Sequence, residues 1–381
     1  MAIGGCIVIE QYTHLFSPGI IGPFKTINRF VSQPMEGNDS DHGAVSADVL
    51  ERYRQLAAGR WGIIIVEALT VDAAALARKD QLVINSNNVP GLTKLIDAIK
   101  AIAPDTLVIF QITHSGRKSG KAFSRPTALY APTPDEHLLT TDEIQEIQDK
   151  FVEAARLSEL AGADGIDFKM CHGYLGGEIL RPANIRDDRW GGSFENRTRF
   201  FREGFARIRE NQQRADFILG SRISYYEGIR GGCGTVAADD VVEDLSEMDE
   251  VIRIMAHMKL DYLNVTAGIP GVTSEIGRPT ATSRWLYLQQ FRYARRAKSL
   301  AQDMKIFGSA YTVLLEESIK AAEENLARGD ADFVGWGRQS LADPHFPAKI
   351  DQGLAVDYCK LCSGCSKHMV RQEKVRCIFR T

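Results

Sequence analysis

Short apolar runs recur along the chain and alternate with longer segments of helical periodicity. The runs lack the polar–apolar alternation of strands that face water on one side, so they indicate strands buried on both faces. There are eight such runs, at residues 29–33, 62–67, 107–111, 165–169, 217–223, 262–265, 305–307 and 332–335.

Amphipathic segments separate the predicted strands. In residues 89–101, Leu92, Leu95 and Ile99 fall on one face of a helix. Residues 141–160 open with Thr-Asp-Glu-Ile, which provides an N-cap candidate and acidic side chains for the first turn. The other helical segments lie at residues 48–57, 194–211, 241–258, 283–300 and 314–327.

This alternation predicts an α/β fold, specifically a (β/α)₈ TIM barrel. An open, doubly wound sheet is the alternative, but no Gly-x-Gly-x-x-Gly motif opens the first strand–helix turn. The rhythm of strands and helices stops near residue 351, where a cysteine-rich tail begins. We therefore expect a barrel over residues 1–350 and a separate segment over residues 351–381.

Composition and charge exclude several classes of protein. The formal net charge is −3, which gives no general attraction to nucleic acid or anionic membranes. No apolar run approaches the ~18–20 residues that span a membrane, and the first ten residues lack the basic start of a signal peptide. We expect a cytoplasmic homo-oligomer that acts on a small molecule and binds neither nucleic acid nor membrane.

Ionisable and amide side chains gather where predicted strands end, on the face that carries TIM-barrel active sites. Gln111 is placed to hydrogen-bond the edge of a heteroaromatic cofactor, although such a residue also caps loops. After the fourth strand, Tyr174 can donate a proton, while His172 or Lys169 can bind an oxyanion. Packing roles for the histidine and the tyrosine are the alternative.

Cations and glycines at the later strand ends suggest a phosphorylated cofactor. Arg222 ends the fifth strand and needs an anionic partner, either a reduced flavin or a barrel carboxylate such as Glu67. Glycines at 308, 335 and 337 lie at the ends of the seventh and eighth strands, where barrels commonly bind phosphate. Backbone N–H groups can approach a phosphate there, and Arg338 adds charge.

Several motifs together carry a family resemblance. Residues 34–35 (Pro-Met), 111–117 (Gln-x-x-His-x-Gly-Arg) and 172–175 (His-Gly-Tyr-Leu) resemble motifs of the old yellow enzyme (NADH:flavin oxidoreductase) family. Residues 182–197, Pro-Ala-Asn-Ile-Arg-Asp-Asp-Arg-Trp-Gly-Gly-Ser-Phe-Glu-Asn-Arg, are similar to the long signature of that family. The resemblance extends over residues 14–344, nearly the whole predicted barrel.

The resemblance implies a non-covalent FMN and assigns roles to individual residues. The substrate-anchoring pair falls on Lys169 and His172, and the proton-donating tyrosine on Tyr174. The positions that correspond to FMN contacts are Pro34, Met35, Glu36, Ala68, Gln111, Arg222, Gly308, Ser309, Gly337 and Arg338.

Three residues depart from the family pattern. Lys169 stands where the family usually has His, which favours an anionic substrate group or a reduced flavin; pairing with a neighbouring carboxylate is the alternative. Glu36 stands where Thr or Cys is frequent, which alters the usual contact to the flavin and excludes a cysteinyl-flavin bond there. Trp190 replaces the usual Tyr, a modest packing change.

Four of the seven cysteines lie in the last 23 residues, a density that indicates a metal or cluster site. Three of them are spaced by two residues, and the fourth follows after eleven. This spacing favours a [4Fe–4S] cluster over zinc, which is more often held by two separated cysteine pairs. His368 is a rival ligand. The expected ligands are Cys359, Cys362, Cys365 and Cys377.

A subgroup of the same family sharpens these expectations. That subgroup, similar to trimethylamine dehydrogenase and bacterial 2,4-dienoyl-CoA reductase, carries a [4Fe–4S] cluster on a comparable tail, followed by a dinucleotide-binding region. Only four residues follow Cys377 here, so we expect the electron partner to be another polypeptide or a diffusing donor such as NAD(P)H.

These features together predict an FMN-dependent oxidoreductase that transfers a hydride between flavin and an activated C=C or carbonyl-conjugated substrate, with the cluster relaying electrons. An amine or alcohol dehydrogenase that passes electrons from FMN through the cluster to an acceptor protein is the second hypothesis. A non-catalytic electron-transfer subunit is the third, and the complete set of Gln111, Arg222 and Arg338 argues against it.

Overall fold

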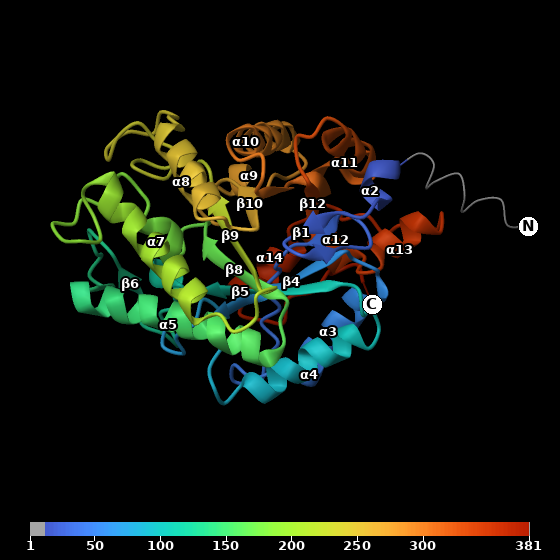
Figure 1. The fold of residues 1–381 in the computed structure, drawn as a ribbon, viewed down its shortest axis with the longest axis horizontal. Coiled ribbons are helices and arrows are strands. Elements are labelled where there is room, and N and C mark those ends of the chain that lie inside the picture. Colours follow the sequence, from blue (N-terminus) through green and yellow to red (C-terminus); the bar gives the residue numbers. More distant parts are fainter. Residues whose placement is uncertain (1–11, 381) are drawn as a thin grey trace, which may run out of the picture.

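The computed structural model describes residues 12–380, so the segment on which the signal-peptide prediction rests lies outside the described part. Eight parallel strands close into a barrel in the order β10-β11-β12-β3-β4-β5-β8-β9 (Figure 1). The predicted TIM barrel is therefore confirmed, and the open sheet is excluded. The barrel strands are β3 (Phe30–Ser32), β4 (Ile63–Thr70), β5 (Leu107–Thr113), β8 (Gly165–Met170), β9 (Ile218–Ser224), β10 (Tyr262–Thr266), β11 (Lys305–Gly308) and β12 (Phe333–Trp336).

Helices surround the barrel, as the amphipathic segments predict. The N-terminus of α5 shows why the local sequence forms a helix: the Thr140 side chain accepts from the Glu143 N–H, and the Glu143 carboxylate accepts from the Thr140 N–H. The major helices are α3 (Ala47–Ala58), α4 (Val89–Lys100), α5 (Thr141–Ala161), α7 (Phe194–Asn211), α8 (Ser246–His257), α10 (Tyr287–Leu300) and α11 (Ser318–Ala327).

Three helices begin later than their hydrophobic pattern predicts. Before α8, Glu243 pairs with Thr235 in an antiparallel bridge, which holds the preceding residues in a loop. The short 3₁₀ helix η2 (Arg284–Leu286) precedes α10. Before α11, η3 (Tyr311–Glu317) contains Leu315 at φ 54°, a left-handed conformation that interrupts a continuous helix.

Two apolar cores stabilise the fold. One lies inside the barrel, where the rings of Tyr262 and Phe307 stack with centroids 4.3 Å apart. The hairpin of β1 (Ile20–Ile21) and β2 (Phe24–Lys25) packs against this core. The larger core lies between the strands and the helices. The two cores bury both faces of the strands, which leaves the loops at their carboxyl ends to build a site.

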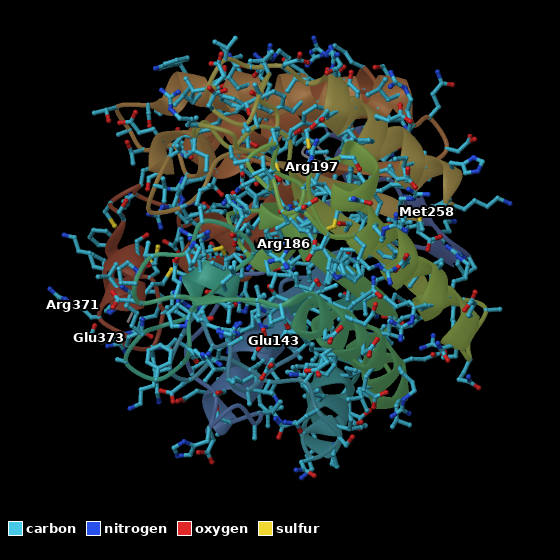
Figure 2. All side chains as sticks on the ribbon, turned by 90° about the vertical axis from the view of Figure 1, so that its left-hand side faces the viewer. Glu143, Arg186, Arg197, Met258, Arg371 and Glu373 are labelled. Carbon is cyan, nitrogen blue, oxygen red and sulfur yellow. The ribbon has the colours of Figure 1, made fainter. Side chains whose placement is uncertain are left out.

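The long signature run mainly ties loops together. Arg186 donates to the backbone carbonyls of Leu129 and Leu139 at 2.6 and 2.7 Å, and Arg197 forms a 2.6 Å ion pair with Glu247 (Figure 2). The buried Arg197 also donates to the Leu180 carbonyl at 2.7 Å, so both guanidinium groups bind loop carbonyls. The run therefore shapes the loops after β5 and β8 and does not itself line the pocket described below.

The cysteine-rich segment packs on the barrel loops beyond α12 (Arg338–Ala342) and α13 (Phe346–Asp351). The Val375 N–H donates to the Gly37 carbonyl at 2.7 Å, and the Asn38 amide donates to the Glu373 carbonyl at 3.1 Å. The cysteine-rich segment contains the helix α14 (Gly364–Val370). This helix lies at the edge of the molecule in Figure 2, next to the labelled Arg371 and Glu373. Within residues 12–380, no helix is both long enough and apolar enough to cross a bilayer.

Candidate active site

A pocket of about 1190 Å³, part of it open to solvent, lies at the carboxyl ends of the barrel strands. Ala68 and Gly308 do not line it: Ala68 is buried in β4, and Gly308 packs beside Tyr311. The sequence-predicted residues that line the pocket are Pro34, Met35, Glu36, Gln111, Lys169, His172, Tyr174, Arg222, Ser309, Gly337 and Arg338.

Glu36 is the centre of a buried network on one wall. Its Oε1 accepts a 2.7 Å hydrogen bond from the Tyr174 hydroxyl and lies 3.3 Å from Lys169 Nζ. Its Oε2 lies 3.1 Å from Arg78 Nε. Burial alone would raise the pKa of Glu36, but Arg78 and Lys169 outweigh it and lower the pKa to about 2. Of the two alternatives for Lys169, pairing with a carboxylate is the one observed.

Lys169 also contacts the aromatic ring of Tyr174, the predicted proton donor. Its Nζ lies 3.4 Å from the centroid of the Tyr174 ring, a cation–π contact. Burial and the Glu36 carboxylate raise the pKa of Tyr174 well above its usual value, so this hydroxyl keeps its proton in the resting protein. A proton donor, a cation and a carboxylate thus face one cavity.

His172 is held in an unusual conformation with a defined tautomer. Its φ is 60°, and its backbone N–H donates to Ser224 Oγ at 3.0 Å. Its Nδ1 lies 3.0 Å from the Gly268 carbonyl, which can only accept, so Nδ1 carries the hydrogen and Nε2 is left as an acceptor. Burial and Arg222 lower the pKa of His172 to about 3, which keeps the ring neutral near pH 7.

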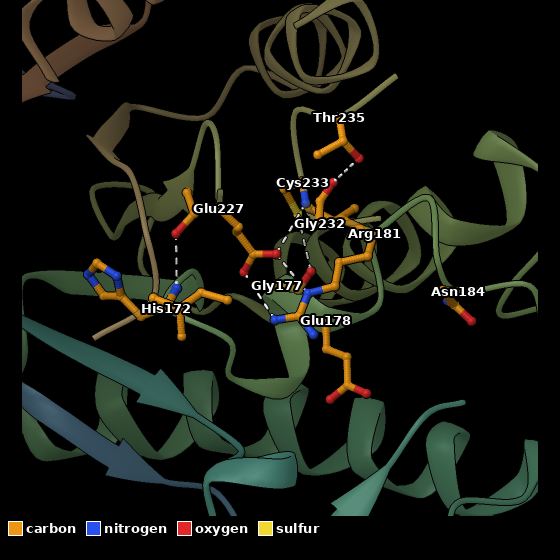
Figure 3. A network of polar contacts seen from close by, with 12 residues as sticks. His172, Gly177, Glu178, Arg181, Asn184, Glu227, Gly232, Cys233 and Thr235 are labelled. Atoms are coloured by element: carbon orange, nitrogen blue, oxygen red, sulfur yellow. Dashed lines mark hydrogen bonds and ion pairs between the residues drawn. The ribbon is translucent and has the colours of Figure 1, made fainter. Parts of the chain in front are cut away.

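A second network holds the loops behind His172. Arg181 and Glu227 form a buried ion pair at 2.7 Å, and the Cys233 N–H donates to the same carboxylate (Figure 3). Thr235 closes the loop by donating to the Gly232 carbonyl at 2.8 Å. This ion pair joins the loop after β8 to the loop after β9, so it fixes the segment that carries His172 and Tyr174.

Two other arginines of the pocket leave buried donors free. Arg222 Nη1 donates to Gln33 Oε1 at 2.9 Å, while its Nε is buried without a partner in the described residues. Arg338 Nη2 donates to the Pro279 carbonyl at 2.7 Å, and its Nη1 is likewise buried and unpartnered. A Cβ on Gly335 would lie 2.0 Å from Gln33 Nε2, so any larger residue there would displace the Gln33 side chain. Free guanidinium N–H groups beside close-packed glycines fit a phosphorylated flavin.

A family model described as the NADH:flavin oxidoreductase / NADH oxidase family matches residues 14–357. The chain belongs to this family. It is accordingly an oxidoreductase of the NADH:flavin oxidoreductase family, and FMN is the flavin expected for it.

Among curated proteins, the chain is 31% identical to an NADH oxidase of Thermoanaerobacter brockii, over 97% of this chain and 56% of that protein. It is 32% identical to an NADPH dehydrogenase of Clostridium acetobutylicum, over 84% and 89%. A solved complex of 2-naphthoyl-CoA reductase superposes with a TM-score of 0.83 at 25% identity, over 96% of this chain and 56% of that one. The chain thus spans about half the length of the first of these relatives and of that solved chain.

Some residues of this NADH:flavin oxidoreductase site escaped the sequence analysis. Arg78 lies in the loop after β4, where no motif marks it. Lys118 directly follows the 111–117 motif, so its position in the sequence could have marked it as a pocket residue. Within that motif, by contrast, His114 is buried beside Gly116, and Arg117 forms ion pairs with Glu136 and Glu178. Other lining residues that were missed include Gln33, Thr266, Arg278 and Met369.

Arg222 has a partner other than the barrel carboxylate that was considered. Glu67 accepts from the Gly37 N–H at 2.8 Å and pairs with Arg52, so it is already satisfied. Arg222 instead contacts the Gln33 amide, which carries no charge. The cation therefore retains its capacity to bind an anion, as expected of a flavin-binding arginine.

The cysteine segment has the backbone geometry of a thiolate-binding loop. The Leu361 N–H donates to Cys359 Sγ, and the Gly364 N–H donates to Cys362 Sγ at 3.4 Å. Leu361 and Ser363 adopt positive φ angles of 52° and 58°, which turn these N–H groups back toward the sulfurs. Across residues 12–380, no three His, Cys, Asp or Glu side chains are close enough to hold a single metal ion.

The cysteine segment also touches the pocket. Met369 of α14 lines the cavity, and Arg278 donates through Nη1 to Ser366 Oγ, next to Cys365. Arg338 lies near the cysteines as well: burial lowers the pKa of Arg338, and the negative charge of a Cys359 thiolate would act against that lowering. The flavin-side arginines and the cysteine loop are thus neighbours.

Proposed function

We propose that this protein is an FMN-dependent reductase of activated C=C bonds. When bound, FMN supplies the hydride and takes electrons from NAD(P)H. The observation that carries the proposal is that Tyr174, Lys169 and His172 face the same cavity as the free N–H groups of Arg222 and Arg338.

Arg338 would hold the phosphate of FMN, and Arg222 the electron-rich edge of its ring. Each carries a buried N–H group without a partner among the described residues, so an anionic ligand would offset the desolvation of that group. Gln111 lines the same cavity, with its Nε2 donating to Asp167 at 3.0 Å, which leaves its carbonyl oxygen for the ligand.

Lys169 would bind the carbonyl oxygen of the substrate, because the Lys169 ammonium is a donor at the pocket surface. His172 presents an acceptor at Nε2, so it donates to an oxyanion only after it gains a proton. A negative substrate oxygen beside the ring favours that protonation. The anchoring role of the pair therefore rests first on Lys169.

Tyr174 would deliver the proton to the carbon that does not receive the hydride. The hydroxyl must turn from Glu36 to the substrate, and the resulting tyrosinate would lie beside Lys169 and within the field of Arg78. Both cations stabilise that anion. General-acid catalysis of this kind contributes about 10²–10⁴-fold to a rate.

We further propose that the four cysteines bind a [4Fe–4S] cluster that relays single electrons to or from the flavin. Two backbone N–H···S contacts support thiolates in this loop. The cysteine spacing, with three cysteines two residues apart and a fourth after eleven, favours the cluster over zinc, which is more often held by two separated cysteine pairs.

A dehydrogenase acting on amines or alcohols is the second candidate. Glu36 pairs with Lys169 and so reduces the positive charge that would repel a protonated amine. In this direction, His172 Nε2 is available to accept a hydrogen bond from the substrate.

Stopped-flow bleaching of the flavin separates the two candidates. NAD(P)H, but not amines or alcohols, should reduce the FMN-loaded protein, and an enone should reoxidise it under anaerobic conditions. Reduction by amines alone would overturn the reductase proposal and support the dehydrogenase.

A further inference from the structure

Two further cations, which in the proposed reaction neither hold the FMN nor bind the substrate carbonyl, line the same pocket. Lys118 ends the short helix η1 (Gly116–Lys118) after β5, and Arg78 lies in the loop after β4. In the barrel order, β5 lies four places from β11 and therefore across the mouth from it. Lys118 is thus on the far side of the cavity from Ser309, which follows β11. Binding of the FMN phosphate therefore does not explain why a cation lies at position 118.

Lys118 has no carboxylate within ion-pair distance among residues 12–380. The nearest acidic groups, Glu178 and Glu227, are bound to Arg117 and Arg181. The stem of Lys118 packs over the loop that carries His172 and Tyr174: a Cβ on Gly173 would lie 3.2 Å from its Cε. Lys118 therefore lines the cavity beside the segment that carries His172 and Tyr174.

Arg78 is only partly satisfied. Its Nη1 donates to the Ala77 carbonyl at 2.8 Å, and its Nε is 3.1 Å from Glu36 without the alignment of a hydrogen bond. Around this wall, Lys118, Arg78 and Lys169 face Glu36 alone, so two positive charges are uncompensated. Burial and the neighbouring cations, Arg181 and Arg78, lower the pKa of Lys118, as expected of like charges held close together.

We propose that Lys118 and Arg78 bind a carboxylate or phosphate group carried by the substrate, so that the enzyme selects anionic electron acceptors. The inference rests on the proposed reductase function and adds the substrate class. An anion offsets the cost of partly burying these two cations, which share only Glu36 as an acidic neighbour in the pocket lining. Guanidinium and ammonium donors suit both oxyanions. Lys169 remains free to bind the carbonyl oxygen next to the reacting double bond.

The test compares three cyclic enones of similar size on the FMN-loaded protein: one neutral, one bearing a carboxylate and one bearing a phosphate ester. The wild type should show a lower KM for at least one charged enone than for the neutral one. The charged enone with the lower KM shows whether the substrate group is a carboxylate or a phosphate. Lys118→Met should raise that KM about tenfold or more, as expected for a lost charge-assisted hydrogen bond. Its effect on the neutral enone should stay within about twofold.

The matched control is Lys121→Met, because Lys121 lies three residues on, is exposed, and pairs with Asp135 at the surface. It should change no KM. Arg78→Met is the second variant and should raise the KM of the charged enones more than that of the neutral enone; because Arg78 also acts on Glu36 and Tyr174, we expect it to slow reduction of every enone as well. Equal effects on charged and neutral enones, or a loss confined to NADPH as donor, would overturn the inference.

A binding measurement separates failure of this inference from failure of the proposed function. Calorimetric titration with the saturated carboxylate or phosphate analogue requires no turnover. Lys118-dependent binding without any enone reduction would support the anion site and refute the reductase function. Enone reduction with charge-independent binding would refute the anion site alone.

Discussion

The Tyr174 hydroxyl donates a 2.7 Å hydrogen bond to Glu36 Oε1, across 138 residues of sequence. The acceptor is a buried carboxylate whose pKa is lowered to about 2, so it is ionised at physiological pH. The proton that the proposed reaction delivers is therefore held, in the resting protein, by a residue that also pairs with Lys169. Tyr174, Lys169 and Glu36 therefore form one hydrogen-bonded and ion-paired network.

Tyr174→Phe should slow enone reduction by about 10²-fold or more, because the general acid is lost. Flavin reduction by NAD(P)H should remain near the wild-type rate, since that half-reaction needs no proton from this residue. Stopped-flow measurement of the two half-reactions checks the assignment. Unchanged reoxidation by the enone would remove Tyr174 from the mechanism.

Glu36→Gln should destabilise the protein by about 3 kcal/mol at pH 7, from the lowering of the pKa from 4.5 to about 2. The folded pKa is depressed, so this contribution is present above the unfolded pKa and is lost as the pH falls toward 2. The difference between wild type and variant should therefore shrink by about 2 kcal/mol between pH 7 and pH 3. Urea unfolding at several pH values measures it; a difference independent of pH would contradict an ionised Glu36.

His172→Asn should reduce the loss of stability on mild acidification. The unfolded pKa of 6.5 falls to about 3 in the fold, so the unfolded state takes up the proton first and the native state loses about 1.4 kcal/mol between pH 7.5 and pH 5.5. The variant lacks this term. Unfolding at the two pH values tests it, with the exposed His42→Gln as control. Equal pH dependence of wild type and His172→Asn would refute a neutral His172.

Arg222→Met should weaken FMN binding about tenfold or more, because the unpartnered guanidinium N–H can no longer meet an anionic ligand. Quenching of flavin fluorescence during titration of the apoprotein gives the dissociation constant. Arg202→Met, at an exposed position of α7, is the control. Wild-type affinity in the Arg222 variant would place the flavin elsewhere.

Cys362→Ala should lose iron and acid-labile sulfide while it keeps FMN, because the cysteine loop and the flavin-side arginines are separate ligand sets. Metal and sulfide analysis after anaerobic purification measures both. Cys233→Ala is the matched control, since Cys233 is buried far from the tail in sequence and donates to the Gly177 carbonyl. Retained sulfide in the Cys362 variant, or zinc in the wild type, would refute the cluster proposal.

The sequence by itself determined the barrel and the strand ends that would carry the site. Buried parallel strands need near-continuous apolar runs, and their carboxyl ends meet on one face, so Gln111, Arg222 and Arg338 were foreseeable pocket residues. Helix starts were less accurate where 3₁₀ turns and a bridge intervene, because short-range pattern does not report a left-handed residue such as Leu315.

Only the tertiary structure decided which charges meet. Lys169 and Glu36 are 133 residues apart, and no local pattern specifies their contact. The tautomer of His172 depends on the Gly268 carbonyl, 96 residues away, and Lys118 gains its importance from the absence of a nearby acid among residues 12–380. Hydrophobic periodicity is a local property of the chain, whereas ionisation and hydrogen-bond direction depend on distances through space. The barrel could therefore be predicted from the sequence, but the electrostatics of its mouth could not.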